Sequence, residues 1–221
     1  PPAAILILGS LLVPLLRGKI QSIYLIALPV LSLLHLLSFQ EGFYGEIVLF
    51  DYNLTMVRID KLSLVFGYIF HIAAFISVIY SLHVRDSVQH VAGLAYMGSA
   101  LGAVFAGDLI TLFVYWELTA ITSVFLIWAR RSRRAYAAGM RYLIIQVGSG
   151  VLLLAGTLLH LHETGSIAFD YLGLGSLGTT LIFIAFGIKC AFPFLHNWLQ
   201  DAYPEATVTG TVFLSAFTTK L

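Results

Sequence analysis

The stretch Gly107–Trp128, GDLITLFVYWELTAITSVFLIW, is an apolar run with a carboxylate, Glu117, near its middle. At 1.5 Å per helical residue it is long enough to cross the roughly 30 Å hydrocarbon core of a bilayer. A carboxylate at that depth costs about 2.5–3.5 kcal/mol on insertion scales, so Glu117 must face protein or water and have a partner. Four arginines at positions 130–134 follow directly and predict that this end lies in the cytoplasm. The stretch thus predicts a membrane span, its orientation and a buried acid.

The composition of the whole chain agrees with this reading. Of its 221 residues, 59% are hydrophobic and 10% are charged, whereas soluble domains have about 25% charged residues. An integral membrane protein with several spans is therefore predicted, and the net charge of +1 does not suggest a nucleic-acid partner. Cys190 is the single cysteine, no nucleotide- or metal-binding motif occurs, and no cofactor is expected. A haem on His71 would need a second histidine at matching depth, and the other candidates lie near helix ends.

Apolar runs recur along the chain and predict an all-α, polytopic membrane helix bundle with about eight transmembrane helices. They are expected at about 3–16, 20–39, 62–84, 88–106, 107–128, 136–161, 174–192 and 206–221. The first and last runs are short, and the first residue is not Met, so a piece of a longer polypeptide is expected. Residues 40–61 are polar, with β-branched and aromatic residues around Asp51–Asn53, and predict a hairpin outside the membrane.

The basic residues predict how the bundle is oriented. Most fall at alternate connections that share one side of the membrane: Arg17, Lys19, Arg85, Arg130, Arg131, Arg133, Arg134 and Arg141. Only Arg58 and Lys61 fall on the opposite side. Because cytoplasmic loops carry the excess of Lys and Arg, the first side is predicted to be cytoplasmic and the N-terminus to lie outside.

Three ionisable residues remain deep inside the predicted spans: Glu117, Lys189 and Lys220. Pro193 follows Lys189 by four positions and cannot donate to its carbonyl, which predicts a broken helix at the lysine. We hypothesise that Glu117 and Lys189 form an ion pair that sets when the lysine holds a proton, and that Lys220 is the next relay station. The alternative is that these residues are structural ion pairs, or interfacial side chains that reach toward water.

Other polar residues are weaker candidates. His196 would link cytoplasmic water to Lys189, although a solvated interfacial histidine fits the pattern equally well. Asp108 is placed to cap the N-terminus of the central span, with a secondary place near a proton exit path. Asp201 is a secondary candidate for the site, and Asp201 and Glu205 both also fit a capping role near the start of the last run.

Three segments together resemble the antiporter-like proton-pumping subunits. They are GDLITLFVYWELTAITSVFLI, GIKCAFPFLHNWLQDAYPEAT with the later FTTK, and RIDKLSLVF. This family includes the large membrane subunits of respiratory complex I and subunits A and D of multi-subunit Na⁺/H⁺ antiporters, and DAYPEATVTG favours the D type. Departures from the family pattern occur at Gln200 and near Thr207, where the family often has proline.

The resemblance implies a fold of about fourteen helices with two inverted repeats of five, each containing a broken helix. This chain corresponds to the N-terminal half: helices one to three with the hairpin in residues 1–87, and a truncated first repeat, helices four to eight, in residues 88–221. Glu117 matches the family's fifth-helix glutamate, Lys189 the lysine of the broken seventh helix, Lys220 the eighth-helix lysine and His196 the histidine after the break.

The resemblance also implies a function and a setting. The expected function is proton translocation in the cell (inner) membrane, with no catalytic chemistry of its own. Other membrane subunits are the expected partners, protons are the ions moved, and Na⁺ is a further candidate. A proton-pumping subunit of a complex I-like NADH:quinone oxidoreductase or membrane hydrogenase is the alternative. A solute transporter or a non-conducting membrane scaffold is the alternative from another class.

Overall fold

The computed structural model describes residues 1–49 and 52–220; the predicted hairpin turn at Asp51 and the last residue, Leu221, lie outside this range. The chain folds into helices with one β-hairpin, which confirms the predicted fold class. The helices are α1 (Pro2–Ser10), α2 (Gly18–Leu37), α3 (Lys61–Ser81), α4 (Ser87–Val104), α5 (Leu109–Trp128), α6 (Arg133–Thr164), α7 (Leu177–Lys189), α8 (Asn197–Ala202) and α9 (Val208–Phe217). Short 3₁₀ turns occupy Val13–Leu15, Tyr203–Glu205 and Thr218–Lys220.

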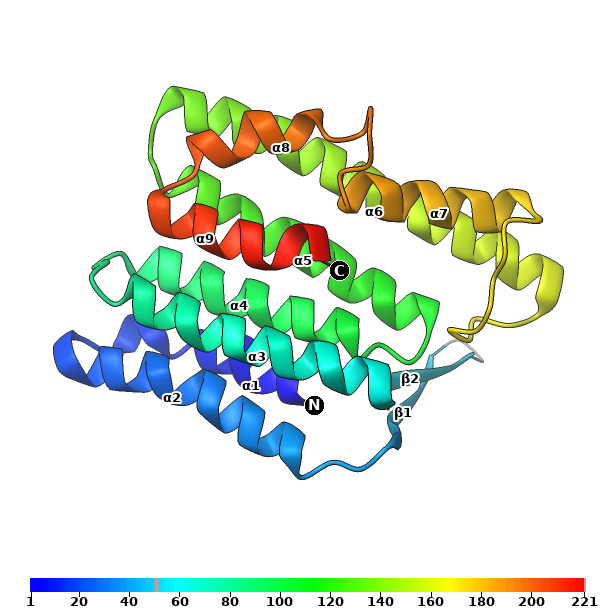
Figure 1. The fold of residues 1–221 in the computed structure, drawn as a ribbon, viewed down its shortest axis with the longest axis horizontal. Coiled ribbons are helices and arrows are strands. Elements are labelled where there is room, and N and C mark those ends of the chain that lie inside the picture. Colours follow the sequence, from blue (N-terminus) through cyan, green and yellow to red (C-terminus); the bar gives the residue numbers. More distant parts are fainter. Residues whose placement is uncertain (50–51, 221) are drawn as a thin grey trace.

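Four helices are long and apolar enough to cross a membrane by length and composition: α2, α3, α5 and α6. Two shorter apolar stretches are α7 and the N-terminal Pro2–Leu15. The helices lie side by side and run back and forth along one direction, with α1 to α4 on one side of the bundle and α6 to α8 on the other (Figure 1). Helices α7 and α8 follow one another along α6, as expected for one helix broken in two.

Helix α4 lies inside the bundle, and twelve of its 18 residues are buried. Its glycines let the neighbouring helices approach closely, as is usual where membrane helices pack. Gly98 faces Leu6 of α1, Gly102 faces the Tyr115 ring of α5, and Gly93 faces the Phe213 ring of α9. Helix α4 therefore joins the N-terminal helices to α5 and α9.

Two glycines also bring α6 and α7 together. A Cβ added at Gly156 of α6 would lie 2.6 Å from the carbonyl oxygen of Gly178 in α7, and one added at Gly178 would lie 2.9 Å from that of Gly156. The two backbones are therefore in direct contact at this crossing. The crossing fixes the N-terminal part of α7 against α6.

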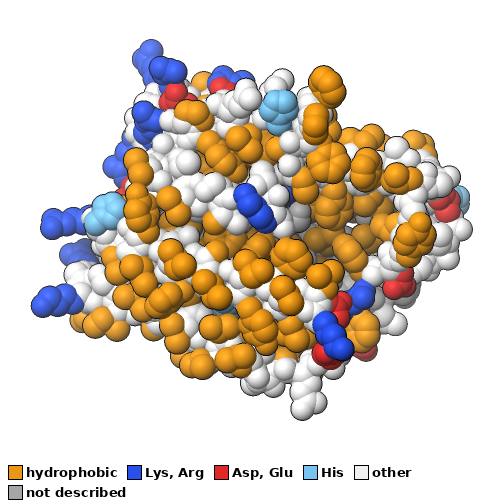
Figure 2. Space-filling view, in the orientation of Figure 1, with side chains coloured by type: hydrophobic (Ala, Val, Ile, Leu, Met, Phe, Trp, Pro, Cys, Tyr) orange, Lys and Arg blue, Asp and Glu red, His pale blue; other side chains and the backbone are white. Residues whose placement is uncertain are grey.

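The outer face of the bundle is apolar, and its basic residues are unevenly distributed. Figure 2 shows apolar side chains over most of one face, and Lys and Arg side chains gathered along the edge where the α1–α2, α3–α4 and α5–α6 connections lie. The hairpin lies at the opposite end of the bundle. This is the asymmetry on which the predicted orientation depends.

The hairpin is formed by β1 (Gly42–Leu49) and β2 (Tyr52–Ile59), which pair antiparallel from Gly42 opposite Ile59 to Leu49 opposite Tyr52. It is bound to the helices by backbone hydrogen bonds: Gly107 N–H donates to Thr55 O over 3.1 Å, and Arg58 N–H donates to Phe105 O over 2.7 Å. Strand β2 therefore holds the connection between α4 and α5.

Candidate functional site

Lys189, the last residue of α7, is only 1% exposed. Its Nζ donates to the Thr119 hydroxyl over 3.0 Å and to the Trp116 carbonyl over 3.3 Å, and it lies 4.6 Å from the centroid of the Trp116 ring. An aromatic face attracts an ammonium by about 0.5–2 kcal/mol, most strongly when both are removed from water. The lysine is therefore held by α5 through neutral groups that tolerate either protonation state.

The helix break predicted from Pro193 is present and begins at Lys189. Ala191 and Phe194 adopt positive φ angles of 56° and 71°, a region that costs non-glycine residues of order 1–3 kcal/mol. Phe192 N–H donates to Gly187 O over 2.9 Å, and the Trp198 indole of α8 donates to Ile188 O over 3.0 Å. The first bond satisfies a carbonyl at the break, and the second adds a side-chain donor to Ile188 O, which also accepts from the Ala191 amide, so the strained turn is held from both sides.

Glu117 lies on α5 against Gly150 of α6. A Cβ at Gly150 would lie 2.7 Å from the Glu117 carboxyl carbon and closer still to Oε1, so the glycine makes room for the acid. Glu117 Oε1 is buried and has no hydrogen-bond partner in the described part of the chain. Leaving such an atom unpaired costs about 1–3 kcal/mol, and more when it is charged.

The structure brings Glu117 and Lys189 close together without the predicted contact between them. Within residues 1–49 and 52–220, no ion pair joins the two side chains. The lysine instead donates to the carbonyl of Trp116, the residue before Glu117. The expected ion pair is therefore corrected to a neighbouring acid and base, each with separate contacts.

Uncharged polar residues link α5 and α6 near this pair, and the sequence alone did not single them out. The Trp116 indole donates to Ser149 of α6 over 2.9 Å, and Ser123 of α5 bonds the Tyr142 hydroxyl of α6 over 2.8 Å. Gln146 of α6 is fully buried, and neither of its polar side-chain atoms has a partner among the described residues. The glutamine within the apolar run LIIQVGSGVLLL is the sequence signal that could have pointed to this face.

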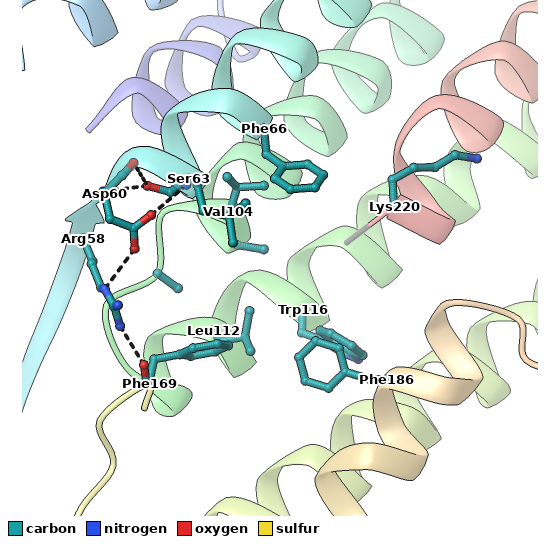
Figure 3. Close-up of a pocket in the computed structure, with 13 residues that line it drawn as sticks. Arg58, Asp60, Ser63, Phe66, Val104, Leu112, Trp116, Phe169, Phe186 and Lys220 are labelled. Carbon is teal, nitrogen blue, oxygen red and sulfur yellow. Dashed lines mark hydrogen bonds and ion pairs between the residues drawn. The ribbon is translucent and has the colours of Figure 1, made fainter. Parts of the chain in front are cut away.

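Lys220 ends the 3₁₀ turn Thr218–Lys220 and is exposed. Its Nζ donates to Ser215 O over 2.7 Å and to the Thr219 hydroxyl over 2.8 Å. It lines a pocket of about 380 Å³ together with Trp116 and Phe186, and its side chain points away from the Arg58 end (Figure 3). The structure thus places Lys220 beside a pocket that reaches the Trp116 ring, and does not bring it into contact with Lys189.

The remaining candidates lie at the ends of the helices. Asp108 caps α5, as predicted: it accepts from the Thr111 amide over 2.7 Å and hydroxyl over 2.9 Å, and also from the Thr55 amide of β2 over 2.6 Å. His196 is half-buried at the position before α8, and its side chain makes no capping bond there.

The capping roles predicted for Asp201 and Glu205 are wrong. Asp201 accepts two hydrogen bonds from Arg141 of α6, of 2.6 and 2.7 Å, and Glu205 pairs with Arg134 over 3.1 Å. The cap of α9 is Thr207, whose hydroxyl accepts from the Gly210 amide. These ion pairs tie the segment after the break to the start of α6.

His71 is a structural residue in α3. One ring nitrogen lies 2.8 Å from the Ser32 hydroxyl of α2 and the other 2.7 Å from Gly67 O, so both are engaged in hydrogen bonds. Nor do the described residues contain a group of three His, Cys, Asp or Glu side chains arranged to hold a metal ion.

Comparison with known proteins places this arrangement in a family. Residues 106–221 match the transmembrane family described as NADH:quinone oxidoreductase/Mrp antiporter. NADH-quinone oxidoreductase subunit M of Pseudomonas aeruginosa is 30% identical over 74% of this chain and 36% of its own length. Na⁺/H⁺ antiporter subunit A1 of Staphylococcus aureus is 30% identical over 72% of this chain and 22% of its own.

A solved structure of the Mrp complex from Dietzia sp. DQ12-45-1b has the same fold, with a TM-score of 0.84 over 99% of this chain and 26% of that one, at 22% identity. The chain spans about a quarter to a third of the length of the curated relatives that it matches. The matched region begins just before α5 and includes Glu117, Lys189 and Lys220. This chain is a membrane protein and belongs to the transmembrane family of NADH:quinone oxidoreductases and Mrp antiporters.

Proposed function

We propose that this chain is part of a proton-translocating subunit of a multi-subunit membrane complex. One observation carries the proposal: an amine, Lys189, is enclosed at a helix break and held by neutral groups, with a carboxylate on the adjoining helix. Intramembrane ionisable groups are costly and mark ion or proton pathways. A buried lysine that is tolerated both charged and neutral is suited to taking up and releasing a proton.

In the proposed route, protons pass between His196, Lys189 and Lys220. His196 lies on the α8 side of the break, Lys189 lies at its α7 end, and Lys220 borders the pocket that reaches Trp116 from the hairpin side. Glu117 favours the protonated lysine when its carboxylate is charged. The end of the bundle with the clustered arginines lies on the cytoplasmic side of the inner membrane, and the N-terminus lies on the outer side.

We further propose that the complex is a Na⁺/H⁺ antiporter. The sequence DAYPEATVTG supports assigning this chain to the D type among the large antiporter subunits. The similarity to NADH-quinone oxidoreductase subunit M supports a second candidate, a subunit of a redox-driven complex. Purifying the full-length subunit with its partners separates the two. Small antiporter subunits support the first candidate, whereas iron–sulfur and quinone-site subunits support the second.

The test of proton translocation is Lys189→Met in the full-length subunit, assembled in its complex and measured in membrane vesicles with a pH-sensitive dye. Methionine has a similar length and no proton to exchange, so flux is expected to fall to background. Lys61→Met makes the same change at an exposed position and is the matched control. Unchanged flux in the Lys189 variant would remove the proposal and favour a scaffold.

A further inference from the structure

Gln146 is 0% exposed, and both Oε1 and Nε2 lack a partner among the described residues. A glutamine amide offers two donors and an acceptor. Buried groups of this kind are almost always paired, either with protein or with ordered water. The Gln146 amide therefore needs hydrogen-bond partners from within the enclosed space around it.

The contacts between α5 and α6 show where Gln146 lies. The helices run antiparallel, and three pairs fix their register: Trp116 with Ser149, Glu117 with Gly150, and Ser123 with Tyr142. Gln146 falls between the last two pairs on α6, which places it at the level of Thr119 on α5. Thr119 is the residue whose hydroxyl accepts from Lys189. Gln146 and the lysine amine therefore share one level of the bundle.

The groups nearest in sequence and register already have partners. The Thr119 hydroxyl donates to Trp116 O over 2.6 Å, and the Ser123 hydroxyl is bonded to Ala120 O and to Tyr142. Lipid and a partner subunit are both excluded, because no surface of Gln146 is exposed to them. Water is the remaining polar group small enough to be enclosed with the side chain.

We propose that Gln146 binds internal water that connects Lys189 with the Ser123–Tyr142 pair. Gln146 is thus a positioning residue that orients the water. The Lys189 ammonium donates two of its N–H groups to Trp116 O and Thr119, and its third N–H is left to bind this water. The same water accepts a hydrogen bond from the Lys189 ammonium and donates one to the neutral amine, so it bridges Lys189 and the Ser123–Tyr142 pair in both protonation states. This inference rests on the proposed proton translocation.

The first test compares Gln146→Met with Gln146→Asn in the full-length assembled subunit. Methionine keeps the length but loses the hydrogen bonds, and proton flux is expected to fall about tenfold, which corresponds to about 1.4 kcal/mol, the scale of one hydrogen bond. Asparagine keeps an amide and is expected to retain at least about threefold more flux than methionine. Leu153→Met, in the buried part of the same helix, is the matched control and is expected to leave the flux unchanged.

The outcomes separate this inference from the proposed function. If Lys189→Met abolishes flux and Gln146→Met does not reduce it, or if asparagine is no better than methionine, the role of Gln146 is refuted and the relay stands. If Lys189→Met has no effect, the proposed function fails.

A density map of the unmodified complex, at a resolution that shows ordered water elsewhere, gives an answer even where a variant does not assemble. Water within hydrogen-bond distance of the Gln146 amide supports the inference. Density that shows none there overturns it.

Discussion

Gly150→Ala is a sharp test of whether the position of the Glu117 carboxylate matters. The new methyl carbon would lie 2.7 Å from the carboxyl carbon of Glu117, and closer to Oε1, with Trp116 Cδ1 at 3.4 Å. Ordinary contact begins at 3.4 Å, so the carboxyl carbon has to move by at least about 0.7 Å, and the oxygen by more. The carboxyl group is the end of a flexible side chain, so the backbone is expected to stay in place.

The expected effect on transport is large compared with the effect on stability. A misplacement of about 1 Å at a reacting group can cost on the order of 100-fold in rate, so a fall in proton flux of about 10- to 100-fold is expected. Alanine is preferred over glycine within helices by about 0.5–1 kcal/mol, which offsets part of the cost of repacking. The variant should therefore assemble and unfold at nearly the unmodified temperature.

Gly148→Ala is the matched control, because it lies two residues away on α6 and an added Cβ would meet nothing within 4 Å. Both variants are measured in the full-length subunit, assembled in its complex, by dye-reported proton flux in vesicles and by thermal unfolding in detergent. If Gly150→Ala transports protons as fast as Gly148→Ala, the location of the carboxylate beside α6 has no part in transport.

Three further predictions concern the helices that hold the site. Asp108→Ala removes the α5 cap and the bond to Thr55, and is expected to cost about 1–2 kcal/mol and to speed hydrogen exchange at the Thr55 amide; Asp108→Asn should retain most of that stability, and equal losses would refute the capping role. Gly156→Ala puts a methyl group 2.6 Å from Gly178 O, and a loss of about 1–3 kcal/mol in thermal unfolding is expected; no loss would show that the helices separate freely. Asp60 caps α3, and hydrogen bonds from Ser63 hold the pKa of its carboxyl group below the usual 3.8. Its contribution to stability is therefore complete above pH 3.8 and is lost as the pH falls through the lower folded pKa. Unfolding of the Asp60→Asn variant should lack this pH dependence, and an unchanged acid profile would contradict it.

Much of the fold follows from the sequence because hydropathy and breakers act locally. The runs of apolar residues predicted the main helices, and Pro193 predicted the end of α7 at Lys189. Asp108 was recognisable as a cap because a cap is defined by the residues next to it. The charged candidates were also visible, since a charge within an apolar run is conspicuous whatever surrounds it.

The partners of those residues could not be predicted in the same way. Asp201 bonds Arg141, which is 60 positions away, so its ion pair depends on how α8 lies along α6. The contact of Lys189 with Trp116 and Thr119 likewise depends on the packing of α7 against α5. Gln146 carries no charge, and the level that it shares with Thr119 follows only from the register of α5 and α6.

The contact of Gly156 with Gly178 makes α7 a lever with its fulcrum near one end. Lys189 follows Gly178 by eleven positions, a lever arm of about 16 Å at 1.5 Å per residue. A tilt of only about 4° at the fulcrum displaces the amine by about 1 Å, which is comparable to the margin between making and losing a hydrogen bond. The bonds from Lys189 to Trp116 O and Thr119, and from the Trp198 indole to Ile188 O, hold this end of α7 against such a tilt.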